Sequence, residues 1–191
     1  MLLVDTNRCC GCGICTTICP QGLELEVENG YAQIINETAD CMDKAMRACP
    51  QNAIAEIKGK LVFAIGTDDD KTIKANDHVG MANFFHILEY SDGELIFKEK
   101  RANPKYNEDE TRTHGDPGKA KATASALRGV DVLVGKRFGP NIIRLKNQFV
   151  CAIIREKEIA GVMDIIKKNI GSILVEKNNK DGRERSGIVL K

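Results

Sequence analysis

Short apolar runs, each only a few residues long, fill the first third of the chain and predict a small module over residues 1–57. Leu23–Ile35 alternates apolar and polar residues around Asn29-Gly30, which predicts two strands joined by a type I′ turn. The other predicted elements are a strand at Leu2–Val4, a short helix at Asp40–Ala48 and a closing strand at Ala53–Ile57. Such a module buries little apolar surface, so we expect a bound cofactor to hold it folded.

Longer apolar runs begin at Leu61 and predict a larger second module over residues 61–170. The predicted strands are Leu61–Ile65, Phe84–Tyr90, Glu94–Lys100, Val130–Val134 and Phe149–Ile154, and the predicted helices are Lys119–Leu127, Pro140–Lys146 and Glu158–Asn169. Asp92-Gly93 marks a hairpin, after which strands alternate with helices, so we expect a mixed sheet flanked by helices. Residues 101–118 predict a long loop, and residues 171–191 a final hairpin or tail.

The chain of 191 residues carries a formal net charge of +1, which hides an asymmetry. Residues 1–57 hold three basic and eight acidic residues, a balance of −5, so the remainder carries +6. An acidic module suits electrostatic docking on a basic redox partner protein. The basic remainder suits an anionic ligand or is simply a solvated surface.

The sequence shows no targeting segment and no apolar run of about 18 residues, so we expect a cytoplasmic protein that does not enter a membrane. Aromatic residues make up only 5% of the chain and no basic stripe stands out, which argues against nucleic-acid binding. Seven of the eight cysteines precede residue 50. Without a signal peptide, this concentration predicts a metalloprotein and not a secreted disulfide scaffold.

Four of these cysteines form the run C-x2-C-x2-C-x3-C-P, made of Cys9, Cys12, Cys15 and Cys19-Pro20. This is the bacterial ferredoxin spacing for a [4Fe–4S] cluster. A second Cys-Pro stands at Cys49-Pro50, but Ala39, Met42 and Ala45 occupy the ligand positions that a second run would need. The fourth cysteine of each run ligates the other cluster in two-cluster ferredoxins. By that logic Cys49 completes a single cluster with Cys9, Cys12 and Cys15.

One complete cysteine run with a single second Cys-Pro resembles single-cluster [4Fe–4S] ferredoxins. In these proteins a disulfide often closes the place where the second cluster would lie. The resemblance implies a Cys19–Cys41 disulfide or dithiol pair, with two buried free thiols as the alternative. Cys10 lies between two ligands and is interpreted as a free thiol.

The second module resembles the dinitrogenase iron–molybdenum cofactor biosynthesis family. The matching stretches are Val62–Ile65 with Gly66-Thr67-Asp68, His78-Val79-Gly80-Met81-Ala82, Phe84–Ile87, Val130–Gly135 and Phe138-Gly139-Pro140-Asn141. The resemblance implies a ribonuclease H-like fold and, in some members, binding of the cofactor, its precursors or other metal–sulfur clusters. The family's His-Phe-Gly-Arg is His-Val-Gly-Met here, so Met81 removes a charge that would face an anionic cluster.

Five residues of this module are candidates for cofactor binding: His78, Gly80, Lys136, Arg137 and Gly139. An imidazole is a good ligand for iron or molybdenum, and a structural histidine is the alternative for His78. Lys136 and Arg137 lie where a strand end meets a helix start, a position that attracts anions.

These patterns predict an iron–sulfur protein that transfers electrons through one [4Fe–4S] cluster and whose second module binds or carries a second metal–sulfur cofactor. The alternative is a ferredoxin whose second module docks it to one oxidoreductase. No nucleophile and base stand at a spacing that indicates catalysis, so we do not expect an enzyme.

Overall fold

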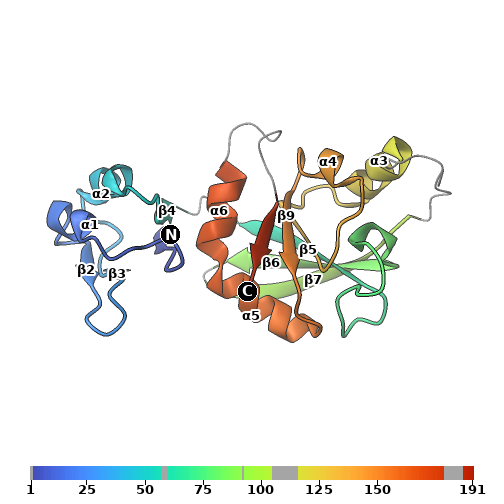
Figure 1. Cartoon of the computed structure of the whole chain (residues 1–191), viewed down its shortest axis with the longest axis horizontal. Helices are drawn as coiled ribbons and strands as arrows, with labels where there is room; N and C mark the ends of the chain where they lie inside the picture. Colours follow the sequence, from blue (N-terminus) through green and yellow to red (C-terminus); the bar gives the residue numbers. More distant parts are fainter. Residues whose placement is uncertain (1, 57–59, 92, 105–115, 179–186) are drawn as a thin grey trace. The chain divides into compact units, whose positions relative to one another are not determined.

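The computed structural model describes the whole chain except residues 1, 57–59, 92, 105–115 and 179–186 (Figure 1). The chain divides into two compact units. The first comprises Met1–Gly59 with Asn169–Val175, and the second comprises Lys60–Lys168 with Glu176–Lys191. Among the described residues, no helix combines the length and apolar character needed to cross a membrane.

The first unit contains two small antiparallel sheets and two short helices. Its elements are β1 (Leu2–Val4), α1 (Ile14–Ile18), β2 (Leu23–Leu25), β3 (Ala32–Ile34), α2 (Met42–Ala48) and β4 (Ile54–Glu56). β1 pairs with β4, and β2 pairs with β3. The predicted strands and helix therefore form, and a small apolar core that includes Leu23, Met42 and Ala45 lies among them.

The turn between β2 and β3 differs from the predicted type I′ turn. That turn needs a positive φ at both central residues, but Gly30 has φ 71° whereas Asn29 is not in that region. A wider loop closes the hairpin instead, with the Gly30 amide donating to the Glu26 carbonyl and the Glu26 amide to the Tyr31 carbonyl, both at 2.8 Å. The apolar alternation that suggested longer strands fails because Val27 is 98% exposed.

The second unit is built on a six-stranded mixed sheet with the order β10-β9-β8-β5-β6-β7. Its strands are β5 (Leu61–Thr67), β6 (Phe84–Ser91), β7 (Glu94–Ala102), β8 (Val132–Gly135), β9 (Val150–Ile154) and β10 (Ile188–Leu190). β5, β6 and β7 are antiparallel neighbours, whereas β5, β8, β9 and β10 run parallel. The predicted mixed sheet is confirmed. The ribonuclease H-like fold stays a prediction.

Helices cover the sheet of the second unit (Figure 1). They are η1 (Val79–Met81), α3 (Pro117–Ala126), α4 (Ile142–Leu145) and α5 (Ile159–Lys168). One core joins Ala64, Phe85 and Leu133 of the sheet to Leu127, just after α3, and to Leu145 of α4. Asp116 begins α3, because its carboxylate accepts a hydrogen bond from the Gly118 amide at 2.7 Å.

The predicted C-terminal hairpin or tail over residues 171–191 is wrong. The chain forms helix α6 (Ile170–Asn178) and then β10, which pairs parallel to β9. Ile170, Ile173 and Leu174 are buried at helical spacing, so their period of three to four residues decides the structure. The predicted loop over residues 101–118 is also shorter than expected, because β7 reaches Ala102 and α3 begins at Pro117; residues 105–115 lie outside the described part.

Candidate functional site

Two segments of the first unit supply the predicted cluster ligands. Cys9 and Cys12 lie on the loop after β1, Cys15 lies in α1, and Cys49 directly follows α2. Burial raises the pKa of the Cys15 thiol, and the nearby Cys49 and Cys9 thiolates raise this pKa further. Three of the four predicted ligands therefore lie close enough to interact electrostatically. Iron binding relieves such repulsion, because each thiolate gives its charge to a metal.

Backbone amides already donate to two of these sulfur atoms. The Ala32 amide lies 3.4 Å from the Cys9 sulfur, and the Ala53 amide lies 3.3 Å from the Cys49 sulfur. Hydrogen bonds of this kind stabilise the charge on cluster thiolates and help to set the reduction potential. The donors come from β3 and from the residue before β4, so the tertiary fold, and not the cysteine loop alone, prepares the ligands.

The cysteine loop packs closely against the β2–β3 hairpin at Gly11. Its φ is 66°, and a Cβ added there would lie 2.2 Å from the Gly30 carbonyl oxygen. Only a glycine fits this position. The close approach, the sulfur-directed amides and the four thiols together fit a [4Fe–4S] cluster, with Cys9, Cys12, Cys15 and Cys49 as the residues that would hold it.

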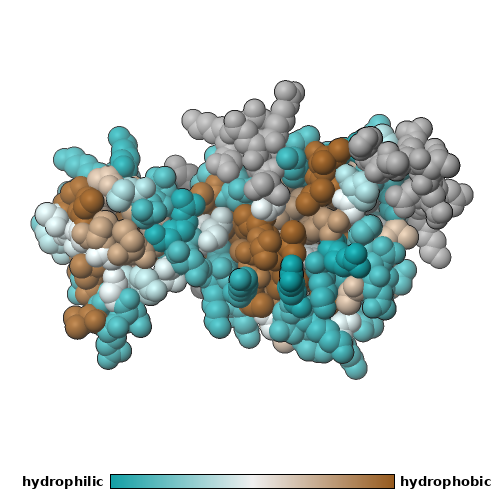
Figure 2. Space-filling view, viewed as in Figure 1, coloured by the Kyte–Doolittle hydropathy of each residue, from teal (hydrophilic) through white to brown (hydrophobic). Residues whose placement is uncertain are grey.

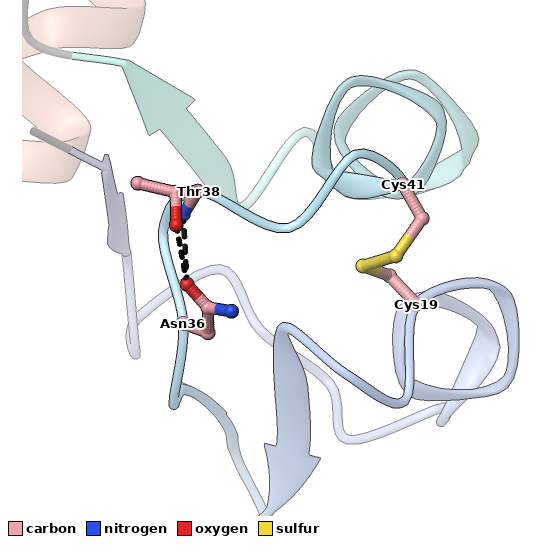
Figure 3. The surroundings of a disulfide bond; sticks show 4 residues. All are labelled: Cys19, Asn36, Thr38 and Cys41. Carbon is pink, nitrogen blue, oxygen red and sulfur yellow. Dashed lines mark hydrogen bonds between the residues drawn. A yellow bond between two sulfur atoms is a disulfide. The ribbon is translucent and has the colours of Figure 1, made fainter.

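Cys19 and Cys41 form a disulfide bond in the structure, with a sulfur–sulfur distance of 2.05 Å and Cα atoms 5.2 Å apart (Figure 3). Cys19 ends α1 and Cys41 begins α2, so the bond links the two helices. Next to it, Asn36 accepts hydrogen bonds from the amide and the hydroxyl of Thr38 and closes a turn. Cys10 is exposed and Cys151 is buried, and neither forms a disulfide bond.

The second unit has a small cavity where η1 meets the turn before α4. Its volume is about 40 Å³, and three of the predicted binding residues line it, namely His78, Gly80 and Gly139. The His78 ring lies so close to Gly139 that an added Cβ would be 2.5 Å from the imidazole Cδ2. A hydrogen bond joins η1 to the turn before α4, because the Val79 amide donates to the Arg137 carbonyl at 2.9 Å.

One ring nitrogen of His78, Nδ1, is buried and has no hydrogen-bond partner within the described residues. Leaving a buried polar atom unpaired costs about 1–3 kcal/mol, so such an atom calls for a partner, which is an ordered water, an ion or a ligand. The described residues therefore do not satisfy this nitrogen, and the ligand role of His78 stays a prediction.

Lys136 and Arg137 do not line this cavity. Lys136 instead contributes its charge near Glu156, whose pKa is lowered mainly by the Glu158 and Lys157 amides. Arg137 still lies beside this region through its backbone, because its carbonyl accepts the hydrogen bond from the Val79 amide next to His78. Within the described chain, no three His, Cys, Asp or Glu side chains are arranged around a single metal ion.

The sequence did not indicate two further residues of this region. Lys119 of α3 lines the cavity, although it follows His78 by 41 positions. The Asn103 amide donates to the carbonyls of Gly80 at 2.9 Å and Ala82 at 2.8 Å, and so fixes η1. No local pattern signals either residue, because β7 and α3 bring them to η1 only in the folded chain.

The cysteine loop and the two-sheet fold define the first unit as a ferredoxin-type iron–sulfur domain. Residues 4–56 match the family described as the 4Fe-4S single cluster domain of Ferredoxin I. A ferredoxin of Thermococcus litoralis is 36% identical over 52 residues, covering 27% of this chain and 88% of the relative. Ferredoxin-2 of Nitratidesulfovibrio vulgaris is 33% identical over 55 residues, covering 28% of this chain and 86% of the relative. One [4Fe–4S] cluster is the cofactor of this domain.

The second unit, which is the larger part of the chain, shows the family to which the protein belongs. Residues 59–170 match the family model described as dinitrogenase iron-molybdenum cofactor, and the chain belongs to that family. The protein thus joins a single-cluster ferredoxin domain to a domain of the dinitrogenase iron–molybdenum cofactor family, and it is an iron–sulfur electron-transfer protein. Neither family description names a catalytic activity.

Proposed function

We propose that this protein passes single electrons through a cluster held by Cys9, Cys12, Cys15 and Cys49, and that its second unit carries a metal–sulfur cofactor bound at His78. The cluster then adjusts the redox state of the cargo. The buried, unpaired Nδ1 of His78 is the observation that carries the second half of the proposal. A neutral imidazole is a good ligand for iron and molybdenum.

The surface around the cluster loop supports exchange of electrons with a protein partner. Cys12 is exposed, and Ile14 and Leu25 nearby keep about 42% and 39% of their surface in solvent. Figure 2 shows hydrophobic residues on the surface of this unit among hydrophilic ones. A small apolar patch within the acidic module suits brief docking, since the charge steers the partner and the patch contributes contact area.

The test is anaerobic isolation of the full chain from its native host, followed by iron, molybdenum, copper and sulfide analysis per chain. One cluster gives about four irons and four sulfides. We expect additional iron or molybdenum in the wild type, and its loss in His78→Ala. His86→Ala is the matched control, because His86 bonds to Asp70 and does not line the cavity.

Additional metal that survives His78→Ala would contradict the assignment of this cavity. Iron and sulfide near one cluster, with no other metal, would instead support a ferredoxin whose second unit only docks to an oxidoreductase. That second candidate is favoured by the edge strand β7, where Ile96 and Phe97 expose 52% and 53% of their surface. Tight binding to a redox enzyme that is lost on Phe97→Ser would support it.

A further inference from the structure

Asp5 connects the two chain segments that supply the predicted cluster ligands. It directly follows β1, and its carbonyl accepts a hydrogen bond from the Cys9 amide at 2.9 Å. Its own amide donates to the Ala53 carbonyl at 2.7 Å, and the Ala53 amide in turn lies 3.3 Å from the Cys49 sulfur. The position of the Asp5 backbone therefore affects one ligand on the cysteine loop and one ligand after α2.

The side chain of Asp5 is held by residues 169–175, which contain the first part of α6 and belong to the same unit. Asp5 is only 3% exposed, and its carboxylate accepts hydrogen bonds from the Asn7 amide at 2.9 Å and the Ser172 hydroxyl at 2.6 Å. The Asn7 side chain also donates to the side-chain oxygen of Asn169 at 3.0 Å. Since a buried carboxylate needs hydrogen-bond donors, α6 fixes Asp5 in place.

Helix α6 approaches Asp5 so closely at Gly171 that no side chain fits between them. A Cβ added to Gly171 would lie 2.4 Å from the Asp5 Cβ and 3.0 Å from the Asp5 Cα. These atoms lie on or next to the backbone, so no rotation of a flexible side chain relieves the contact, and the backbone of Asp5 or of α6 would have to move. Glycine is a weaker helix former than alanine, so the close packing accounts for a glycine at this position.

The hydrogen bonds that Asp5 helps to place affect the reduction potential of a bound cluster. A reduced cluster carries one more negative charge than an oxidised one, so amide donors to its sulfur ligands stabilise the reduced form more. Two such donors are the Ala53 amide at Cys49 and the Ala32 amide at Cys9. Because these bonds depend on distance and angle, a displacement of Asp5 that carries Ala53 and Cys9 with it weakens both and lowers the potential.

We propose that Asp5 is a positioning residue for electron transfer, and that Gly171 and Ser172 hold it in place, so that helix α6 helps to set the reduction potential of the [4Fe–4S] cluster. None of the three residues is a cluster ligand, and each acts through the backbone that carries the ligands. This role rests on the four-cysteine ligand set proposed above and does not depend on metal binding at His78.

The test is an anaerobic redox titration of the full chain, monitored by visible absorbance and electron paramagnetic resonance. Ser172→Ala removes the hydroxyl donor and Gly171→Ala adds the Cβ that meets Asp5, so both should lower the midpoint potential. In Gly171→Ala we expect the ratio of reduced to oxidised cluster at a fixed potential to fall about threefold, equivalent to ~28 mV for one electron. Ser172→Thr keeps the hydroxyl and should keep the potential of the wild type.

The matched controls make the same chemical changes on helices of the second unit. Ser125→Ala removes an exposed hydroxyl from α3, and Gly161→Ala adds a methyl group to α5, where the nearest atoms belong to the flexible side chain of Glu156. Both should keep the potential of the wild type. Thermal unfolding of each apoprotein separates a loss of stability from a change in the cluster.

If Gly171→Ala and Ser172→Ala bind a full cluster at the potential of the wild type, Asp5 has no positioning role, even where the unfolding temperature falls. If Gly171→Ala binds no cluster, Ser172→Ala decides: a lowered potential supports the role and an unchanged one overturns it. An equal shift in Ser125→Ala or Gly161→Ala also overturns it. If the wild type binds fewer than about four irons and four sulfides per chain, the proposed function fails and this role fails with it.

Discussion

Replacing Gly11 with alanine tests whether the cysteine loop must pack against the hairpin in order to hold the cluster. Gly11 has φ 66°, and the new Cβ would lie 2.2 Å from the Gly30 carbonyl oxygen. Gly30 provides the matched control, because its φ is 71° and an added Cβ meets nothing within 4 Å. Both variants therefore carry the same left-handed strain, and only Gly11→Ala adds a steric conflict.

The structure gives the size of each effect. A non-glycine residue in the left-handed region costs about 1–2 kcal/mol, so both variants should lose that much stability. Real Cβ contacts do not fall under 3.0 Å, so relief of the 2.2 Å contact requires the two backbone segments to separate by about 0.8 Å. Sites of this kind tolerate displacements of about 0.5 Å. We therefore expect Gly11→Ala, and not Gly30→Ala, to impair cluster assembly.

The assay is anaerobic reconstitution followed by iron and sulfide analysis and visible absorbance, with thermal unfolding of each variant. Gly30→Ala should bind a full cluster and unfold at a slightly lower temperature, whereas Gly11→Ala should bind well under half as much iron. If Gly11→Ala binds a full cluster and unfolds together with Gly30→Ala, the close packing of loop and hairpin is not required and the reasoning is wrong.

Three other predictions follow from single residues. Cys49→Ala should lower bound iron below that of Cys10→Ala, because only Cys49 is a proposed ligand; equal iron contents would refute that ligand set. Phe63→Ala should destabilise the second unit by about 3–5 kcal/mol in denaturant unfolding, since Phe63 is fully buried, whereas Val189→Ala, at a position 56% exposed, should change it by at most about 0.5 kcal/mol. Backbone amides lower the pKa of Asp69 from 3.8 to about 2, so its stabilising effect is complete above pH 4 and is lost as the pH falls toward 2. The stability difference between wild type and Asp69→Asn should shrink over that interval, and a difference that is constant with pH would contradict this assignment.

Local pattern was sufficient wherever neighbouring residues decide the structure. The continuous apolar run Leu61–Ile65 predicted the buried strand β5, and Asp92-Gly93 predicted the β6–β7 hairpin, in which Gly93 has φ 85°. The local sequence pattern did not predict the structure where the same pattern fits both a strand and a helix. Ile173–Lys177 contains β-branched residues and suggested part of a final hairpin or a tail, yet its apolar positions also fit a helix, and burial on one side selected the helix.

The cluster ligands could be assigned from spacing because the chemistry itself imposes the spacing. Thiolates that share a small cubane must come from a tight loop plus one distant cysteine, and few other arrangements satisfy that geometry. The amides that donate to Cys9 and Cys49 come from Ala32 and Ala53. A backbone amide has no sequence signal of its own, so these donors became visible only in the structure.

The sequence by itself determined the cofactor, the charge asymmetry and the order of β5–β9 and α3–α5, because each depends on residue types at short, regular spacing. Only the tertiary structure decided which of the candidate residues share a cavity. It brought His78 and Gly139 together, added Lys119 and left Lys136 and Arg137 outside. Contacts between η1, α3 and the turn before α4 depend on how elements distant in the chain pack on one sheet, and no local pattern records that arrangement.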